Sequence, residues 1–283
     1  MRVSELLRRT AQRFARAKLH YGHGTHSAKE EAAWLISSVL GFLLEQDLSS
    51  KQIKEIDTLA RRRVRTREPL AYLLREAWLG EHAFYVDRRV IVPRSFIAEL
   101  LREHLSPWLQ REPKRMLDLC TGSGCLAVLL ALEFPHARID ATDLSASALQ
   151  VTNINIRKYE LQRRVRAIRS DLFSSLKGKY DLIVSNPPYV TARSMKKLPK
   201  EYRHEPARAL AAGKDGLDLV NRILVEARSH LNPGGLLVCE IGGNRKALER
   251  AYPRLEFLWP EVSDPGTVFI LRREQLPARA NRG

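Results

Sequence analysis

The chain has 283 residues, of which 44% are hydrophobic and 28% are charged; this composition supports a folded core and argues against a disordered or fibrous protein. No segment is apolar over the ~20 residues that a membrane span needs. Because Cys120, Cys125 and Cys239 form no CxxC pair and no histidine cluster lies near them, we expect a cytoplasmic protein without a zinc site.

The positive charge is the strongest signal in the composition. The net charge is +16, and residues 1–75, 157–169 and 193–203 carry +7, +5 and +4 of it. Each segment taken alone could be an ordinary solvated surface. Together the three favour a nucleic acid or ribonucleoprotein partner, because clustered Lys and Arg side chains attract phosphate backbones.

Residues 1–78 are predicted to form a small helical domain that recognises the substrate. Apolar residues recur at helical spacing over 6–17 and 32–40, and Ser27 followed by Glu30 is typical of a helix N-terminus. A third helix is expected over residues 50–67, before Pro69. The Arg-rich residues 1–20 also resemble a mitochondrial presequence, although a surface helix has the same composition.

Residues 79–94 are predicted to be a β-hairpin linker, with its turn at residues 87–89 and Val90 and Val92 in its second strand. Residues 95–283 are predicted to be an α/β domain, because expected strands and helices alternate along them. The helices are expected at 95–108, 125–134, 146–159 and 217–231, and the strands at 116–120, 138–142, 165–168, 180–185 and 236–241. Segments 255–259 and 268–272 are expected to add antiparallel strands at an edge of this mostly parallel sheet.

A glycine-rich turn follows the first of these strands. Gly122 and Gly124 allow the backbone to pass close to a ligand, and Asp143 ends the next strand, where a carboxylate can accept hydrogen bonds from ribose hydroxyls. The turn reads C-T-G-S-G, which suits a nucleoside without a pyrophosphate better than it suits NAD. Asp171 is placed to accept from an adenine amine, with Leu172 packing on the ring.

The fourth strand runs directly into Asn186, Pro187, Pro188 and Tyr189, the most specific motif in the chain. The two prolines make this turn rigid and extended. The side-chain oxygen of Asn186 and the backbone carbonyl of Pro187 can then accept the two N–H bonds of a planar NH2 group, against the flat face of Tyr189. The motif therefore predicts transfer of a methyl group to a conjugated nitrogen.

Two alternatives remain open at this point. An adenine exocyclic amine also presents an NH2 group on a flat ring, although the enzyme would have to extract the base and the chain shows no separate target-recognition domain. A non-catalytic RNA-binding factor with a vestigial cofactor pocket is the other alternative, and the intact Asp143 and Asn186 argue against it.

The chain resembles the N(5)-glutamine methyltransferases of the HemK/PrmC/PrmB group. The resemblance rests on VPRSFIAELL, LDLCTGSGC, DLSASAL, SDLF, DLIVSNPPYV and HEPARALAAGKDGL, and it spans nearly the whole chain. Within the group, YGHGT, FYVDRRVIVPRS and MKKLPKEYRHEP are most similar to the PrmB branch, which methylates a glutamine in the third protein of the large ribosomal subunit. The release-factor branch usually has glycine where this chain has Cys120 and an aromatic residue where it has Leu172.

The resemblance implies a Rossmann-like class I methyltransferase that uses S-adenosylmethionine and no metal. The expected substrate is a ribosomal protein, free or within an assembling large subunit, with ribosomal RNA contacting the basic segments. We expect residues 193–203 to rim the substrate mouth. The expected cofactor-binding residues are Asp118, Cys120, Thr121, Gly122, Ser123, Gly124, Asp143, Leu144, Asp171, Leu172 and Asn186, and the expected catalytic residues are Asn186, Pro187, Pro188 and Tyr189.

Two further side chains lie near these motifs in the sequence. Arg94 is expected either to pair with Glu99 or to line the pocket, and both roles are open. His204 is expected to make a hydrogen bond rather than to act as a base, because methyl transfer to an amide need not begin with removal of a proton.

Overall fold

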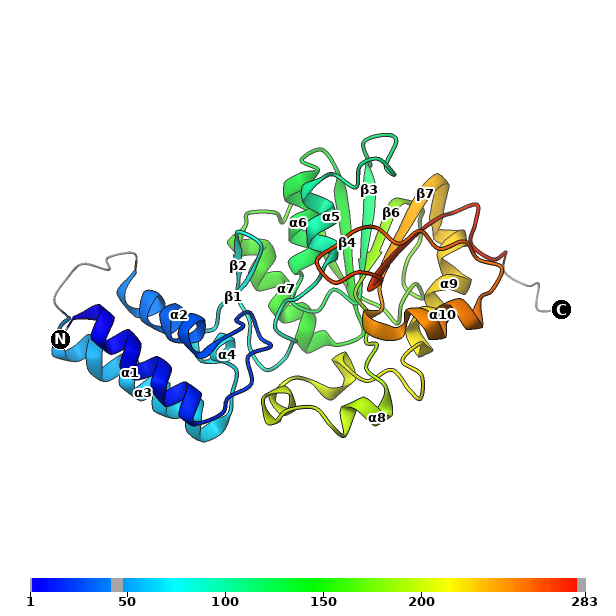
Figure 1. Cartoon of the computed structure of the whole chain (residues 1–283). Coiled ribbons are helices and arrows are strands. Elements are labelled where there is room, and N and C mark those ends of the chain that lie inside the picture. The colour runs from blue at the N-terminus through cyan, green and yellow to red at the C-terminus, as the bar shows by residue number, and fades with distance from the viewer. Residues whose placement is uncertain (1, 42–47, 279–283) are drawn as a thin grey trace.

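The computed structural model describes residues 2–41 and 48–278, so Met1 and the last five residues of the predicted catalytic domain lie outside the described part. A bundle of helices from the first quarter of the chain lies beside a larger α/β unit, and the two are joined by a short hairpin (Figure 1). None of the helices in this described part combines the length and apolarity needed to cross a bilayer.

The N-terminal bundle contains the helices that periodicity predicts. They are α1 (Val3–Arg16), α2 (Ala28–Leu40), α3 (Ser50–Thr66) and the short α4 (Leu70–Leu74), which follows Pro69. The predicted cap of α2 is confirmed, because Ser27 Oγ accepts a hydrogen bond from the Glu30 backbone N–H at 3.2 Å. Phe14, Leu35 and Ile56 are fully buried where the three long helices meet.

The predicted hairpin linker at residues 79–94 is wrong in position. The strands are β1 (Ala77–Leu79) and β2 (His82–Phe84), and residues 85–94 contain no strand. Val90 N–H donates to the Asp87 carbonyl in a turn, and three other backbone donors of that segment bond to side chains instead of to a partner strand. Tyr85 N–H donates to Asn155 Oδ1 at 2.7 Å, Arg89 N–H to Asp87 Oδ1 at 3.0 Å, and Val92 N–H to a glutamate 113 residues away.

The larger unit confirms the predicted α/β fold with a mostly parallel sheet. Its strand order is β5-β4-β3-β6-β7-β8, and only β8 is antiparallel to its neighbour. The strands are β3 (Arg115–Leu119), β4 (Arg138–Asp143), β5 (Val165–Arg169), β6 (Tyr180–Ser185), β7 (Leu231–Glu240) and β8 (Val268–Arg272). The expected second edge strand at 255–259 is reduced to one bridge, between Leu258 and Ile270.

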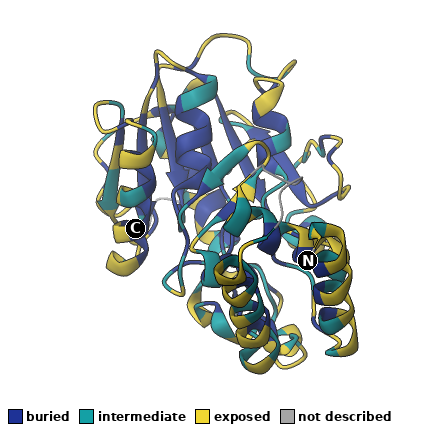
Figure 2. Ribbon diagram, turned by 90° about the vertical axis from the view of Figure 1, so that its left-hand side faces the viewer, coloured by how far each residue is buried: buried dark blue, intermediate teal, exposed yellow. Residues whose placement is uncertain are grey.

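Helices cover both faces of this sheet, and the strands are buried between them (Figure 2). One face packs against α5 (Ile97–Arg102), α6 (Cys125–Glu133) and α7 (Ala146–Lys158), and the other against α9 (Asp218–His230) and α10 (Arg245–Ala251). Helix α5 is shorter than the predicted 95–108. Helix α10 was not predicted.

The connections between the strands indicate where a ligand would bind. From β3 the chain proceeds outward to β4 and β5, whereas from β6 it proceeds the other way to β7 and β8. The neighbours β3 and β6 therefore form the point where the strand order reverses, and ligands of open α/β sheets bind beyond the carboxyl ends of such strands. The glycine-rich turn follows β3 and the Asn-Pro-Pro-Tyr motif follows β6, so the fold brings the two motifs together.

Candidate active site

The glycine-rich turn after β3 has an unusual backbone. Cys120, Gly122 and Gly124 have φ angles of 59°, 56° and 82°, in the left-handed region that favours glycine. A Cβ on Gly124 would lie 2.7 Å from Thr152 Cγ2, whereas a Cβ on Gly122 would have no neighbour closer than 4.0 Å. Gly124 is therefore required by packing against α7, and Gly122 leaves open space next to the backbone for a ligand.

Two carboxylates hold this turn. Asp118 Oδ2 accepts from Thr121 Oγ1 at 2.5 Å and from Ala127 N–H at 3.0 Å, while Asp118 Oδ1 is buried without a partner among the described residues. Burial raises the pKa of Asp118 to about 7. Asp143, at the end of β4, accepts from the backbone N–H groups of Gly122 at 3.0 Å and Ser145 at 2.8 Å.

This arrangement suits a nucleoside cofactor with an amino acid tail. The unpartnered oxygen of Asp118 is an acceptor for an ammonium or hydroxyl group, and each oxygen of Asp143 keeps a second lone pair for a ribose hydroxyl. Leu144, immediately after Asp143, is 54% exposed, which is rare for a large apolar side chain. It offers an apolar surface to a base.

The two residues that were predicted to contact the adenine, Asp171 and Leu172, lie in different environments. Asp171 is half exposed and forms an ion pair with Arg222 at 2.9 Å. Leu172 has a φ angle of 47°, and its side chain is only 5% exposed within the core below the sheet. Little of Leu172 is left for a ring to pack on, so its role at the adenine stays a prediction, as does that of Asp171.

Asn186 is oriented by the backbone of a distant segment. Its Nδ2 donates to the backbone carbonyl of Arg94 at 3.1 Å, which leaves Oδ1 as the free acceptor of the side chain. The four motif residues line one pocket of about 210 Å³, together with Ile91, Arg94, Val190, Leu198, Tyr202, Ala209 and Leu210. Residues 186–189 thus lie together in the wall of one pocket, and their catalytic role stays a prediction.

Tyr189 is held on three sides. Its hydroxyl donates to Glu240 Oε1 at 3.3 Å, and its backbone carbonyl accepts from Asn244 Nδ2 at 2.8 Å. A Cβ on Gly242 would lie 2.6 Å from Cε2 of the ring, so only glycine fits beneath it. The sequence analysis missed Glu240, although a carboxylate that ends a buried strand is itself a signal.

The environment of Glu240 favours its neutral form. The side chain is buried at the carboxyl end of β7, and this burial raises its pKa to about 7. Its other oxygen, Oε2, accepts from Ser95 Oγ at 2.6 Å and from Phe96 N–H at 3.0 Å. Glu240 therefore joins the start of α5 to the tyrosine of the pocket.

Arg94 both lines the pocket and forms an ion pair, but its partner is Glu205 and not the expected Glu99. Nη1 and Nη2 of Arg94 each lie 2.7 Å from a different oxygen of Glu205, which also accepts from Val92 N–H at 2.9 Å. Glu99 instead accepts from Ser263 N–H. Burial alone would raise the pKa of Glu205, but the hydrogen bonds and charge of Arg94 outweigh it and lower the pKa to about 2.

Glu205 is the second functional residue that the sequence analysis missed. It lies in the HEPARALAAGKDGL motif, directly before Pro206, where a buried carboxylate could have been suspected. Because it accepts from the Val92 backbone and from the Arg94 side chain, it also supports the segment whose Arg94 carbonyl orients Asn186. Its position behind the pocket wall could only be found in three dimensions.

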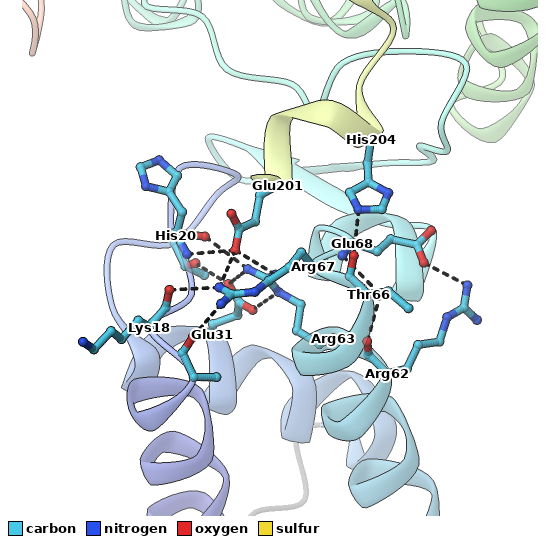
Figure 3. A network of polar contacts seen from close by, with 12 residues as sticks. Lys18, His20, Glu31, Arg62, Arg63, Thr66, Arg67, Glu68, Glu201 and His204 are labelled. Atoms are coloured by element: carbon cyan, nitrogen blue, oxygen red, sulfur yellow. Dashed lines mark hydrogen bonds and ion pairs between the residues drawn. The ribbon is translucent and has the colours of Figure 1, made fainter. Parts of the chain in front are cut away.

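The segment after the motif is anchored to the N-terminal bundle (Figure 3). Glu201 Oε1 accepts from His20 N–H at 3.1 Å and from Arg67 Nη1 at 3.2 Å, and it lies 3.6 Å from Arg63 Nη1. Arg63 is itself buried against Glu31, with Nε 2.6 Å from Oε1. The bundle therefore supports the loop that carries Leu198 and Tyr202 into the pocket wall.

The same segment turns its basic side chains outward. Glu201, its one acidic residue, is 2% exposed, whereas all five basic residues are exposed: Arg193, Lys196, Lys197, Lys200 and Arg203. The prediction that residues 193–203 rim the mouth agrees with Leu198 and Tyr202 in the pocket lining. His204 makes the expected hydrogen bond, with Nε2 2.9 Å from the Thr66 carbonyl oxygen.

The three cysteines are present as thiols. Cys120, Cys125 and Cys239 are free, and burial raises the pKa of each thiol, so all three are protonated at neutral pH. Across residues 2–41 and 48–278, no group of three or more His, Cys, Asp or Glu side chains is placed to hold a metal ion.

Comparisons with known proteins agree with this geometry. Residues 97–252 match the methyltransferase small domain family. A ribosomal protein uL3 glutamine methyltransferase from Neisseria meningitidis serogroup A is 50% identical over 97% of this chain and 94% of its own length. One from Burkholderia pseudomallei is 46% identical over 98% of this chain and 96% of its own length. The chain belongs to the ribosomal protein uL3 glutamine methyltransferases.

Membership of this family confirms the predicted PrmB branch. Among solved structures, the hMettl16 catalytic domain in complex with MAT2A 3'UTR hairpin 6 covers 88% of this chain and 93% of its own, with a TM-score of 0.56 and 14% identity. At that identity the likeness shows the fold alone.

Proposed function

We propose that this uL3 glutamine methyltransferase transfers a methyl group from S-adenosylmethionine to the side-chain amide nitrogen of a glutamine in ribosomal protein uL3. The observation that carries the proposal is the orientation of Asn186. Its amide nitrogen is occupied by the Arg94 carbonyl, so Oδ1 is the atom offered to a substrate NH2 group in the pocket. The relatives named for this activity, which align over nearly the full chain, support the same conclusion.

The pocket addresses the main difficulty of the reaction, which is that the lone pair of an amide nitrogen is delocalised. In the proposed complex, Asn186 Oδ1 accepts one N–H of the glutamine amide and the Pro187 carbonyl accepts the other. These two bonds increase electron density on nitrogen and aim it, and each contributes about 1–3 kcal/mol in a site closed to water. Tyr189, fixed by Glu240, provides the flat face on which the amide lies.

The residues of the glycine-rich turn fit S-adenosylmethionine, whose sulfonium supplies an electrophilic methyl group when bound. Gly122 would allow close approach, and Asp118 and Asp143 would accept hydrogen bonds from its amino acid and ribose parts. Because this turn and Asn186 lie at the ends of the adjacent strands β3 and β6, both reactants would be held side by side. Such positioning can lower the barrier by about 7–11 kcal/mol.

A pair of variants tests the two halves of the site. Asn186→Ala is expected to lower kcat about 100-fold, because one stabilising contact to the reacting group is lost. Asp143→Ala is expected to weaken binding of S-adenosylmethionine in a calorimetric titration. Incubation of purified uL3 with the wild-type protein and S-adenosylmethionine should add the mass of one CH2 group to a single glutamine. Unimpaired turnover by Asn186→Ala would refute the proposed role of the amide.

We also propose that the exposed basic residues of segment 193–203 contact ribosomal RNA near the substrate, and that residues 1–78 help to hold the substrate. The anchoring of this segment to the bundle through Glu201 supports both roles. Replacing Lys196, Lys197 and Lys200 with glutamine should weaken use of an RNA-bound substrate and flatten its salt dependence, since each phosphate contact contributes to the slope. An unchanged salt slope would count against RNA contact here.

A further inference from the structure

A second basic surface lies far from the active site. It is a concave region of about 750 Å³ whose only acidic lining residue is Asp140. We call it the arginine groove, and its basic residues are Arg115, Arg138, Arg157, Arg163, Arg164 and Arg166. Arg115 and Arg138 are the first residues of β3 and β4, so the groove lies at the amino ends of strands whose carboxyl ends hold the cofactor turn.

Three of the arginines are fixed by protein partners. Arg166 Nε lies 3.0 Å and Arg115 Nη2 3.6 Å from Asp140, so this one carboxylate already has two cations. Asp140 also accepts from the Tyr180 hydroxyl at 2.8 Å. Arg164 Nη2 donates to the Ala131 carbonyl at 2.8 Å. These three arginines and Asp140 leave the floor of the groove positively charged.

The other three arginines have no such partner. Arg138, Arg157 and Arg163 are all exposed, and within the part of the chain that the structure describes they make no hydrogen bond or ion pair through their side chains. They come from β4, the end of α7 and the loop before β5, so folding brings them together from separate elements. Gathering three unpaired cations around a floor that is already positive costs repulsion, which a multivalent anion would relieve.

The other lining residues indicate which class of anion fits the groove. Asn153 and Gln162 add exposed amides, which suit phosphate and sugar oxygens. The lining contains no aromatic side chain, so the groove has neither the stacking platform of a single-strand binder nor the aromatic anchors of a protein interface. Clustered guanidinium groups without a stacking surface fit the phosphate backbone of a double helix.

We propose that the arginine groove binds the phosphate backbone of a double-stranded RNA segment. Strand β4 has six residues, so about 20 Å separate this groove from the cofactor edge. A bound duplex would therefore leave the methyl-transfer pocket free. The groove goes beyond the proposed contact of segment 193–203, because it lies at the opposite edge of the sheet and recognises helical RNA rather than the substrate.

The test uses the full chain and a short RNA duplex, with a single strand of the same length as the comparison. The groove variant is Arg138→Glu/Arg157→Glu/Arg163→Glu. The matched control is Lys246→Glu/Arg250→Glu/Arg254→Glu, which changes the net charge equally on exposed residues of α10 and the turn after it. The groove variant is expected to lose at least about 10-fold in duplex affinity, and its slope of log affinity against log salt should fall by about 2–3.

The control variant is expected to retain most of the affinity and slope of the wild type. Both variants should methylate free uL3 at the wild-type rate, since neither set touches the pocket. If the groove variant does not fold, Arg138→Gln/Arg157→Gln/Arg163→Gln provides the same measurement without added negative charge. Equal losses in the groove and control variants, or single-strand binding as tight as duplex binding in the wild type, would overturn the proposal.

Discussion

Glu205 offers the most informative perturbation of this protein, because one buried carboxylate supports both the fold and the pocket. Glu205→Gln preserves the shape of the side chain and removes its charge. The variant can still accept from Val92 N–H, but it can no longer balance the guanidinium of Arg94. The backbone carbonyl of Arg94, which orients Asn186, then loses its support.

The size of the effect follows from the pKa of Glu205. The ion pair lowers it from 4.5 to about 2, and a difference of that size corresponds to about 3 kcal/mol of folding free energy. Since the folded-state pKa is the lower one, this contribution is present in full above pH 4.5 and is lost as the pH falls toward 2. We expect Glu205→Gln to lower the free energy of unfolding by about 3 kcal/mol at pH 7.

Urea unfolding at pH 7 and pH 3 measures this contribution directly, and the difference from the wild type should shrink at the lower pH. Glu249→Gln is the matched control: its ion pair with Arg245, at 2.9 Å on exposed α10, should contribute less than about 1 kcal/mol. Initial rates should also show kcat of Glu205→Gln falling about 10-fold or more, because the amide acceptor is displaced. Wild-type stability at both pH values would refute the charge argument, and unchanged kcat would refute the link to Asn186.

Two further variants concern the tyrosine of the pocket. Gly242→Ala should reduce kcat by about 10-fold or more, because its Cβ would displace the Tyr189 ring. The control is Gly234→Ala, which is also at positive φ but has no neighbour within 4 Å, so its kcat should be unchanged. Equal kcat values in the two variants would exclude the steric explanation. Glu240→Gln should stabilise the protein at pH 8 and have little effect at pH 4.5. Burial raises the pKa of Glu240 to about 7, so the wild type loses stability as the pH rises from 4.5 to 7. Urea unfolding measures the difference in unfolding free energy between Glu240→Gln and the wild type, and a difference that is the same at pH 4.5 and pH 8 would contradict this.

The structure also shows what the N-terminal helical bundle contributes to the pocket of the methyltransferase domain. Glu201 and His204 connect the bundle to the loop that carries Tyr202, and Arg94 lies 5.3 Å from the centre of the Tyr202 ring. The pocket wall is thus assembled from both parts of the chain. The same contacts bury Glu201, the one acidic residue of segment 193–203, and leave its five basic side chains exposed.

The motif chemistry could be recognised in the sequence because it depends on neighbouring residues. Glycines at 122 and 124, the acid at 143 and the rigid turn at 186–189 each act through local backbone geometry, and the alternation of strands and helices then requires them to meet at one edge of a parallel sheet. The capped helix α2 was predicted for the same reason, since a cap and its partner lie three residues apart.

Contacts between residues far apart in the sequence determined the features that were not predicted. The hairpin was misplaced because the backbone donors of Tyr85 and Val92 bond to Asn155 and Glu205, and no local pattern reveals partners 70 and 113 residues away. Glu205 and Glu240 are ordinary carboxylates in the sequence. They become parts of the site only because folding buries each beside specific donors, and burial together with those donors determines their charge and what they hold in place.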